Sequence, residues 1–288
     1  MGAESFYRSE DVAFMVMLER FPVPANHGVH FGALAAGSGS NPRNRIQKGL
    51  ILFWKDLDLS EEGVGFGMPV LKLGTESIFP GSWKMSAERC DGHTMVKAEY
   101  TMNLVTRMAK GDNVIKNRTF CLACDLLSMI HREQPKLRRG MTNLSGILRR
   151  FMGLKDAFGE ISCPGSVSAT YLITGSKVEV FLKFPLIDGC TEKIVLNELG
   201  ANWFDTYTDS DGCVLKGNEI GSWDEIHAYE ATFQDPADGL SFTLKKVDGA
   251  RMFRGRELVP GRLAWSGLAY ILPPQRDELA YSISIGNK

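Results

Sequence analysis

The sequence lacks the features by which several large classes of protein are recognised. Its charge is almost balanced, with 33 Lys and Arg against 34 Asp and Glu, so no overall field would attract nucleic acid or anionic lipid. No apolar run approaches the roughly 18 residues of a membrane-spanning helix. The first apolar run, residues 12–18, follows Glu10 and Asp11, which is unlike a signal peptide. We therefore expect a cytoplasmic protein with neither nucleic-acid partners nor integral membrane association.

Motifs for common cofactors and reactions are also missing. The chain has no Gly-x-Gly-x-x-Gly fingerprint, no Walker A loop, no His-Glu-x-x-His and no Gly-x-Ser-x-Gly elbow. The Gly-rich segment 63–67 lies inside a strand-like run, which predicts close backbone packing rather than a phosphate loop. We expect chemistry that needs no cofactor.

The six cysteines have no spacing typical of a disulfide framework. Two pairs, Cys90 with His93 and Cys121 with Cys124, have the two-residue gap of zinc ligands and together make a formal Cys₃His set. Because Cys121 and Cys124 lie in an apolar stretch, buried thiols explain them equally well. The zinc hypothesis stays open, and the sequence assigns no metal site.

What the sequence does contain is a long series of short, β-branched and aromatic segments separated by Gly, Asp, Asn and Pro. The alternation is clearest in residues 177–183 and 240–247. Such spacing favours a barrel or a sandwich. Expected strands are 28–36, 49–56, 64–73, 94–106, 114–120, 166–174, 177–187, 191–198, 212–216, 226–234, 239–247, 262–272 and 279–285.

One helix is expected at 143–152, where Leu144, Ile147, Leu148 and Phe151 share a face. The surrounding segment 132–155 is rich in Lys and Arg. Two interpretations stay open for it: weak contact with an anionic membrane surface, or a solvated linker between two halves of the chain.

An ordered motif occurs twice, about half the chain apart. Residues 70–83 and 214–223 both follow the order Val-Leu-Lys, Gly, Glu, Ile, Gly-Ser-Trp. Short matches can arise by chance in a Gly-rich chain, but the shared order and the half-length spacing favour an internal duplication.

The two tripeptides Gly81-Ser82-Trp83 and Gly221-Ser222-Trp223 match the Gly-x-Trp pattern of lipocalins. Two such units in one chain resemble the tandem lipocalin-like family that includes carotenoid hydratases and natural-product cyclases. The resemblance implies a mostly β fold with two antiparallel lipocalin-like barrels, residues 1–140 and 141–288, related by duplication and joined by a short helix.

A barrel of about eight strands can hold one small ligand. We therefore expect the chain to bind a hydrophobic, terpenoid- or polyketide-like molecule and to catalyse its hydration, isomerisation or cyclisation. Two alternatives stay open. One is a double-hotdog acyl thioesterase or dehydratase, which would need central helices near 10–20 and 143–152. The other is a non-catalytic carrier of a lipophilic ligand.

The best concentration of acid and base groups follows the second motif. On a strand, Glu225, His227 and Tyr229 would share a face. If that face lines a cavity, His227 would be the acid/base and Glu225 would orient it; alternatively these residues face solvent and Ile226 and Ala228 face inward. The candidate ligand contacts are broad aromatic side chains, for which core packing is the alternative role: Trp83, Trp223, Tyr229 and Trp265.

Overall fold

The computed structural model describes residues 3–9, 12–18, 21–22, 29–33, 49–54, 57–60, 63–74, 76–90, 92–109, 156–221, 223–237, 239–259 and 263–287. Within these ranges the chain is almost entirely antiparallel β-structure, and the one helical element is a 3-10 turn, Gly217–Ile220. The expectation of a mostly β protein is confirmed. None of the helices described is long and apolar enough to cross a membrane.

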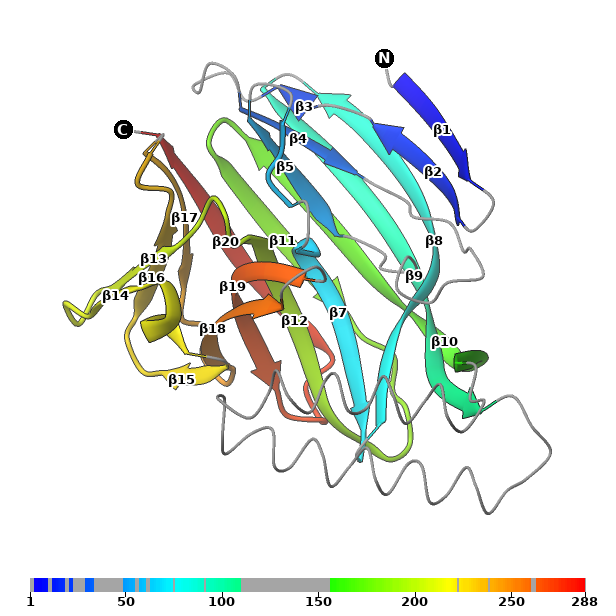
Figure 1. Cartoon of the computed structure of the whole chain (residues 1–288). Helices are drawn as coiled ribbons and strands as arrows, with labels where there is room; N and C mark the ends of the chain where they lie inside the picture. Colours follow the sequence, from blue (N-terminus) through cyan, green and yellow to red (C-terminus); the bar gives the residue numbers. More distant parts are fainter. Residues whose placement is uncertain are drawn as a thin grey trace, which may run out of the picture. The chain divides into compact units, whose positions relative to one another are not determined.

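Strands β3 to β20 belong to one connected hydrogen-bonded set, which can be followed as two runs (Figure 1). The first run has the order β10–β11–β20–β17–β16–β13–β14. Its strands are β10 (Asp156–Thr174), β11 (Lys177–Lys183), β20 (Glu278–Asn287), β17 (Leu240–Lys245), β16 (Glu230–Gln234), β13 (Thr206–Asp209) and β14 (Val214–Lys216).

The second run has the order β9–β8–β7–β12–β19–β18–β15. Its strands are β9 (His93–Ala109), β8 (Glu76–Cys90), β7 (Gly65–Leu73), β12 (Cys190–Gly200), β19 (Leu263–Leu272), β18 (Arg251–Val259) and β15 (Asp224–Ile226). One end of β7 also pairs with β5, which leads to β4, β3 and β6. These are β5 (Leu50–Trp54), β4 (Val29–Ala33), β3 (Phe21–Pro22) and β6 (Leu57–Asp58).

A separate hairpin joins β1 (Ala3–Ser9) to β2 (Val12–Leu18). Residues 12–18 are therefore a strand, and this removes one of the two helices that a double-hotdog fold would need. The expected helix at 143–152, and with it the basic segment 132–155, lies outside the described residues.

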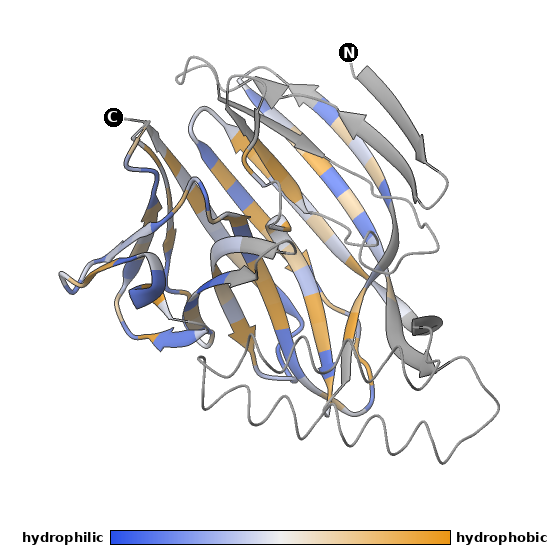
Figure 2. Cartoon of the chain, viewed as in Figure 1, coloured by the Kyte–Doolittle hydropathy of each residue, from blue (hydrophilic) through white to orange (hydrophobic). Residues whose placement is uncertain are grey.

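The two runs pack against each other through their alternating apolar faces. In β11 the buried residues are Val178, Val180 and Leu182, and the residues between them are partly or fully exposed. Figure 2 shows this alternation as hydrophobic and hydrophilic bands along the strands. Across the interior, Phe66 of β7 meets Phe242 of β17 edge-on, with ring centroids 5.5 Å apart. This interior is the core of the fold.

A β-bulge in β7 shows why the chain carries glycines here. Met68 pairs with Leu196 and Phe66 with Asn197, so Gly67 has no partner residue on β12. Its φ is +75°, and a Cβ atom would lie 2.8 Å from the Tyr171 hydroxyl oxygen. The Gly67 N–H donates to Asn197 Oδ1 at 3.1 Å. The prediction that segment 63–67 serves close backbone packing is confirmed.

The structure does not confirm the expected duplication. The first copy of the repeated motif lies in strands β7 and β8, whereas the second spans β14, the 3-10 turn and the approach to β15. Compact units of the chain are 1–104 together with 162–288, and 105–161. The expected boundary at 140 falls where no residue is described, so the organisation into halves 1–140 and 141–288 stays a prediction.

Candidate functional site

The candidate site lies on the face of β12, β19 and β18 that points away from the core. Residues directly opposite on antiparallel strands share a face, and so do alternate residues along one strand. The register places Glu198, Gly267 and Gly255 in one row across the three strands. The next row on the same face is Gly200, Trp265 and Glu257. Two carboxylates and a tryptophan are thus brought together from strands that are far apart in sequence.

Glu198 is buried although it lies on this outer face, with 6% of its surface exposed. Residues from the segment just before β7 cover it: Gly63 lies against the Glu198 backbone, and the Gly200 N–H donates to the Leu59 carbonyl at 2.7 Å. The pKa of the Glu198 carboxyl is raised to about 8, mainly by burial and also by the negative charge of Glu257. A hydrogen bond from the Val64 backbone lowers this pKa, but by less than burial and Glu257 raise it. Glu198 therefore carries its proton at neutral pH.

Two tryptophans stack beside the carboxyl pair. The rings of Trp223 and Trp265 have centroids 4.8 Å apart and an interplanar angle of 28°. They lie over Gly255, where a Cβ atom would be 2.9 Å from the Trp223 backbone nitrogen and 3.2 Å from the Trp265 ring. Trp265 is buried and Trp223 is partly exposed, so the outer ring can receive a ligand.

Trp223 also has an unusual backbone conformation. Its φ is +59°, and it is the one residue other than glycine with a positive φ among the described residues. For a bulky side chain this conformation costs on the order of 1–3 kcal/mol, and such strain is concentrated at functional sites. The surrounding structure therefore holds Trp223 in a strained backbone conformation, which fixes the position of its ring.

A third tryptophan adds a hydrogen-bond donor without a partner. Trp203 packs on Gly200, whose Cβ atom would lie 3.2 Å from the Trp203 ring and 3.8 Å from its Nε1. The Trp203 Nε1 atom is buried and has no hydrogen-bond partner among the described residues. Buried donors are nearly always satisfied, so an unpaired N–H at this position is an unusual feature next to the site.

Gly267 provides the space that Glu198 occupies, and this gives a stability prediction. A Cβ atom at position 267 would lie 2.3 Å from the Asn197 backbone oxygen and 2.9 Å from Glu198 Cγ. Gly267→Ala should lower the free energy of unfolding by about 1–3 kcal/mol, because backbone atoms cannot move aside cheaply. Urea unfolding measures this loss. Ser284→Ala, at an exposed position in β20, is the control and should change stability by less than about 0.5 kcal/mol; equal stability of the two variants would contradict this packing.

Of the two residues predicted to be catalytic, Glu225 is opposite Phe253 in the register and so lies on the same outer face as this site, whereas His227 lies beyond the end of β15. Glu225, His227 and Tyr229 are all exposed, whereas Ile226 and Ala228 are buried. Glu225 forms an ion pair with Arg251 at 3.6 Å. The arrangement matches the alternative in which these polar groups face solvent, so a catalytic role for His227 and Glu225 stays a prediction without support from their burial.

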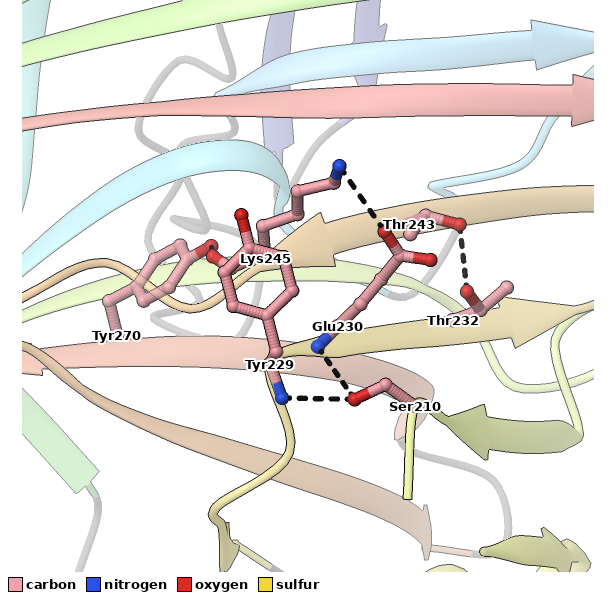
Figure 3. A network of polar contacts seen from close by, with 7 residues as sticks. All are labelled: Ser210, Tyr229, Glu230, Thr232, Thr243, Lys245 and Tyr270. Atoms are coloured by element: carbon pink, nitrogen blue, oxygen red, sulfur yellow. Dashed lines mark hydrogen bonds and ion pairs between the residues drawn. The ribbon is translucent and has the colours of Figure 1, made fainter. Parts of the chain in front are cut away.

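Tyr229 belongs to a surface network with Ser210, Glu230 and Lys245 (Figure 3). Its backbone N–H donates to the Ser210 hydroxyl at 3.0 Å, and the Lys245 ammonium lies 5.8 Å from the centre of its ring. These contacts explain Tyr229 as a surface residue of the β16–β17 hairpin. Trp83 pairs with Tyr100 in the β8–β9 hairpin through the backbone register. Of the four predicted ligand contacts, the structure brings Trp223 and Trp265 together.

The zinc hypothesis rests partly on residues outside the described ranges. Cys90 and His93 are opposite each other in the β8–β9 hairpin, but Cys121 and Cys124 are not described. Among the described residues there is no group of three or more side chains that could hold a metal ion.

No protein-family model and no curated protein sequence matches the chain. Its structure is similar to that of an α-N-acetylgalactosaminidase from Bifidobacterium bifidum in complex with GalNAc, with a TM-score of 0.51 and 8% identity. That alignment covers 94% of this chain and 36% of the glycosidase, so the chain spans about a third of that enzyme's length. At this identity the likeness shows the fold alone.

Two further solved structures are more distant. A glycoside hydrolase family 97 enzyme from Pseudoalteromonas sp. strain K8, in complex with acarbose, aligns with a TM-score of 0.37 and 11% identity over 93% of this chain and 35% of that one. A galactose mutarotase related enzyme from Lactobacillus acidophilus aligns with a TM-score of 0.31 and 5% identity over 99% of this chain and 97% of that one.

Proposed function

We propose that this chain binds a sugar at the site formed by Glu198, Glu257, Trp223 and Trp265. The observation that carries the proposal is a buried carboxyl, whose pKa burial raises, on the same face as a tryptophan stack with one strained and partly exposed ring. A pyranose ring has an apolar face of C–H groups, which packs on an aromatic ring, and a rim of hydroxyls, which needs donors and acceptors. Glu198, Glu257 and the Trp203 N–H supply both kinds of group. The similar glycosidase structure, which holds GalNAc, agrees with this ligand class.

The same groups support a cofactor-free isomerisation. In the opening of an aldose ring, Glu257 would accept the proton of the anomeric hydroxyl while Glu198 donates its proton to the ring oxygen. The bond between the anomeric carbon and the ring oxygen breaks, which gives the open-chain aldehyde. Reclosure on the other face of the carbonyl, with both proton transfers reversed, gives the other anomer. A carboxyl that keeps its proton at neutral pH is suited to the acid step.

Ligand titration with a matched pair of variants tests the binding. We expect N-acetylgalactosamine, galactose or glucose to bind in calorimetry, and Trp223→Ala to weaken that binding roughly tenfold, because the stacking surface is lost. Tyr229→Ala removes an aromatic ring that is 62% exposed and lies outside the site, so it should bind as the natural chain does. Equal affinity of the two variants, or a loss in Tyr229→Ala alone, would place the ligand elsewhere.

A second candidate keeps the hydrophobic ligand expected from the sequence. Its support is a patch of partly exposed apolar residues on the same face of the second run: Ile194, Leu196, Phe253 and Ile271. A lipophilic fluorescent probe that binds and is displaced by terpenoid-like compounds, but not by sugars, would favour this candidate. Displacement by sugars would favour the carbohydrate.

A further inference from the structure

The outer face of β12, β19 and β18 continues well beyond the Glu198 site. Two more rows follow toward the start of β12: Leu196, Ala269 and Phe253, and then Ile194, Ile271 and Arg251. From Trp265 to Ile271 is six residues of one strand, which at about 3.3 Å per residue is about 20 Å. Leu196, Ile194, Phe253 and Ile271 are partly exposed, so the rows form a surface that a ligand can reach. A single sugar ring is too short to contact both ends.

A groove of about 490 Å³ lies at the far end of these rows. This volume is within the usual range for a small-molecule site, about 300–1,000 Å³. Two residues of the last row, Ile271 and Arg251, belong to its lining, together with Thr191, Glu192, Gly249, Ala250, Leu272 and Pro273. The groove and the Glu198 site therefore share one face and are connected by the same three strands.

The charged side chains at the groove are paired with one another. The Arg251 guanidinium lies 5.2 Å from the centre of the Phe253 ring and makes ion pairs with Glu192 at 3.0 Å and Glu225 at 3.6 Å. Guanidinium and carboxylate groups of this kind can donate to and accept from sugar hydroxyls. Glu192, Glu225 and Glu257 are equal in number to the basic residues near them, Arg251, Lys72 and Arg276, so this face has no excess of positive charge that would favour an anionic ligand.

We propose that the ligand of this face is a neutral oligosaccharide of several rings, with one ring on the Trp223–Trp265 stack and another in the groove beside Ile271 and Arg251. This inference rests on the proposed function, because it names the class of sugar that the same site would take. It predicts that affinity depends on chain length and on charge, which a site for one ring would not show.

Calorimetry on the full-length chain tests the inference with a neutral monosaccharide, its oligomers of two to five units, and an acidic oligomer of uronic acid units. We expect affinity to rise roughly tenfold or more between the monomer and the longer neutral chains, because each added ring gains contact with the surface, and the acidic oligomer to bind more weakly. Ile271→Glu should remove most of the gain with length and leave monosaccharide binding unchanged. Leu172→Glu is the matched control, since Leu172 is also a partly exposed aliphatic residue but lies on β10.

Each outcome decides something different. Equal affinity for the monomer and the oligomers overturns the extended site and leaves the sugar-binding function standing. The same loss in Leu172→Glu as in Ile271→Glu also overturns it, because the effect would not come from the groove. If neutral sugars of every length fail to bind, the proposed function fails, and the inference fails with it.

Discussion

We expect the natural chain to lose stability between about pH 4.5 and pH 8, and we expect the replacement of Glu198 with Gln to remove this loss. Below pH 4.5 the carboxyl is protonated in both the folded and the unfolded chain. As the pH rises above the ordinary value of 4.5, the unfolded chain loses this proton, while the folded chain keeps it up to about pH 8. The unfolded state then binds fewer protons, so the free energy of unfolding falls until both states are ionised.

The expected size of this effect follows from the shift in pKa. The shift in the Glu198 pKa from 4.5 to about 8 corresponds to a change in the free energy of unfolding on the order of 5 kcal/mol, since each pKa unit is about 1.4 kcal/mol. A glutamine side chain at this position would have the same shape as the carboxyl and no charge to bury. The Glu198→Gln variant should therefore be the more stable protein at pH 8, and the difference should be small at pH 4.5.

Urea unfolding at several pH values between 4.5 and 8.5 measures this difference. Glu278→Gln is the control, because Glu278 pairs with Lys183 at 3.5 Å on a surface where both side chains are 68% exposed. It should follow the pH dependence of the natural chain closely. A parallel pH dependence for Glu198→Gln would mean that the carboxyl is ionised in the fold and cannot serve as an acid.

The same titration governs the proposed reaction. If Glu198 donates a proton to the ring oxygen, the rate of anomer exchange, followed by polarimetry, should fall as the pH rises through about 8. Glu198→Gln should lose this activity and still bind sugar on the tryptophan stack. The pH dependence of unfolding and the pH dependence of the rate would then be two independent measurements of the ionisation of Glu198.

Much of the strand structure could be predicted because it depends on local pattern. Residues 177–183 alternate between apolar and polar, and they form β11 with the alternate residues buried. Trp223 and Trp265 could be selected as candidate ligand contacts because large aromatic faces are rare enough to notice. The glycines at 63–67 were recognisable as a packing feature for a similar reason: they interrupt a strand-like run.

Glu198 could not be selected because its environment comes from distant parts of the chain. Along β12, Ile194, Leu196 and Glu198 alternate with the core residues, and by this pattern alone Glu198 would face solvent. Contacts from Leu59, Gly63, Val64 and Gly267 bury it instead. The one local signal is the polar pair Asn197-Glu198 inside an apolar strand, which marks an unusual position without saying what covers it.

The repeated motif is a local signal that the structure does not confirm as a duplication. Its two copies share residues in the same order, but the first lies in long paired strands and the second in a short turn. Local identity over about ten residues does not fix secondary structure when the pairing partners differ, since strand formation depends on the neighbouring strands. The catalytic role predicted for His227 and Glu225 depended on their place after the second copy; both side chains are exposed, and that role stays a prediction.

The neighbour of Glu198 carries the other large expected effect: Asn197→Leu should lower the free energy of unfolding by about 3–5 kcal/mol. The Asn197 side chain is fully buried, and its Oδ1 accepts from the Tyr281 hydroxyl at 2.7 Å and from the Gly67 N–H at 3.1 Å. Its Nδ2 donates to the Leu268 carbonyl at 3.4 Å. Leucine would fill the space but leave two buried donors without an acceptor, each costing about 1–3 kcal/mol.

Urea unfolding of three variants separates this loss from general damage. Tyr281→Phe removes one of the two donors and should cost less than Asn197→Leu. Asn202→Leu, at an exposed position in the turn after β12, should change stability by less than about 0.5 kcal/mol. A cost for Asn197→Leu no greater than that of Asn202→Leu would show that the buried amide is dispensable. Because Asn197 holds the bulge at Gly67 and so fixes the register of β7 on β12, its loss should also displace Glu198, and sugar affinity should fall with stability.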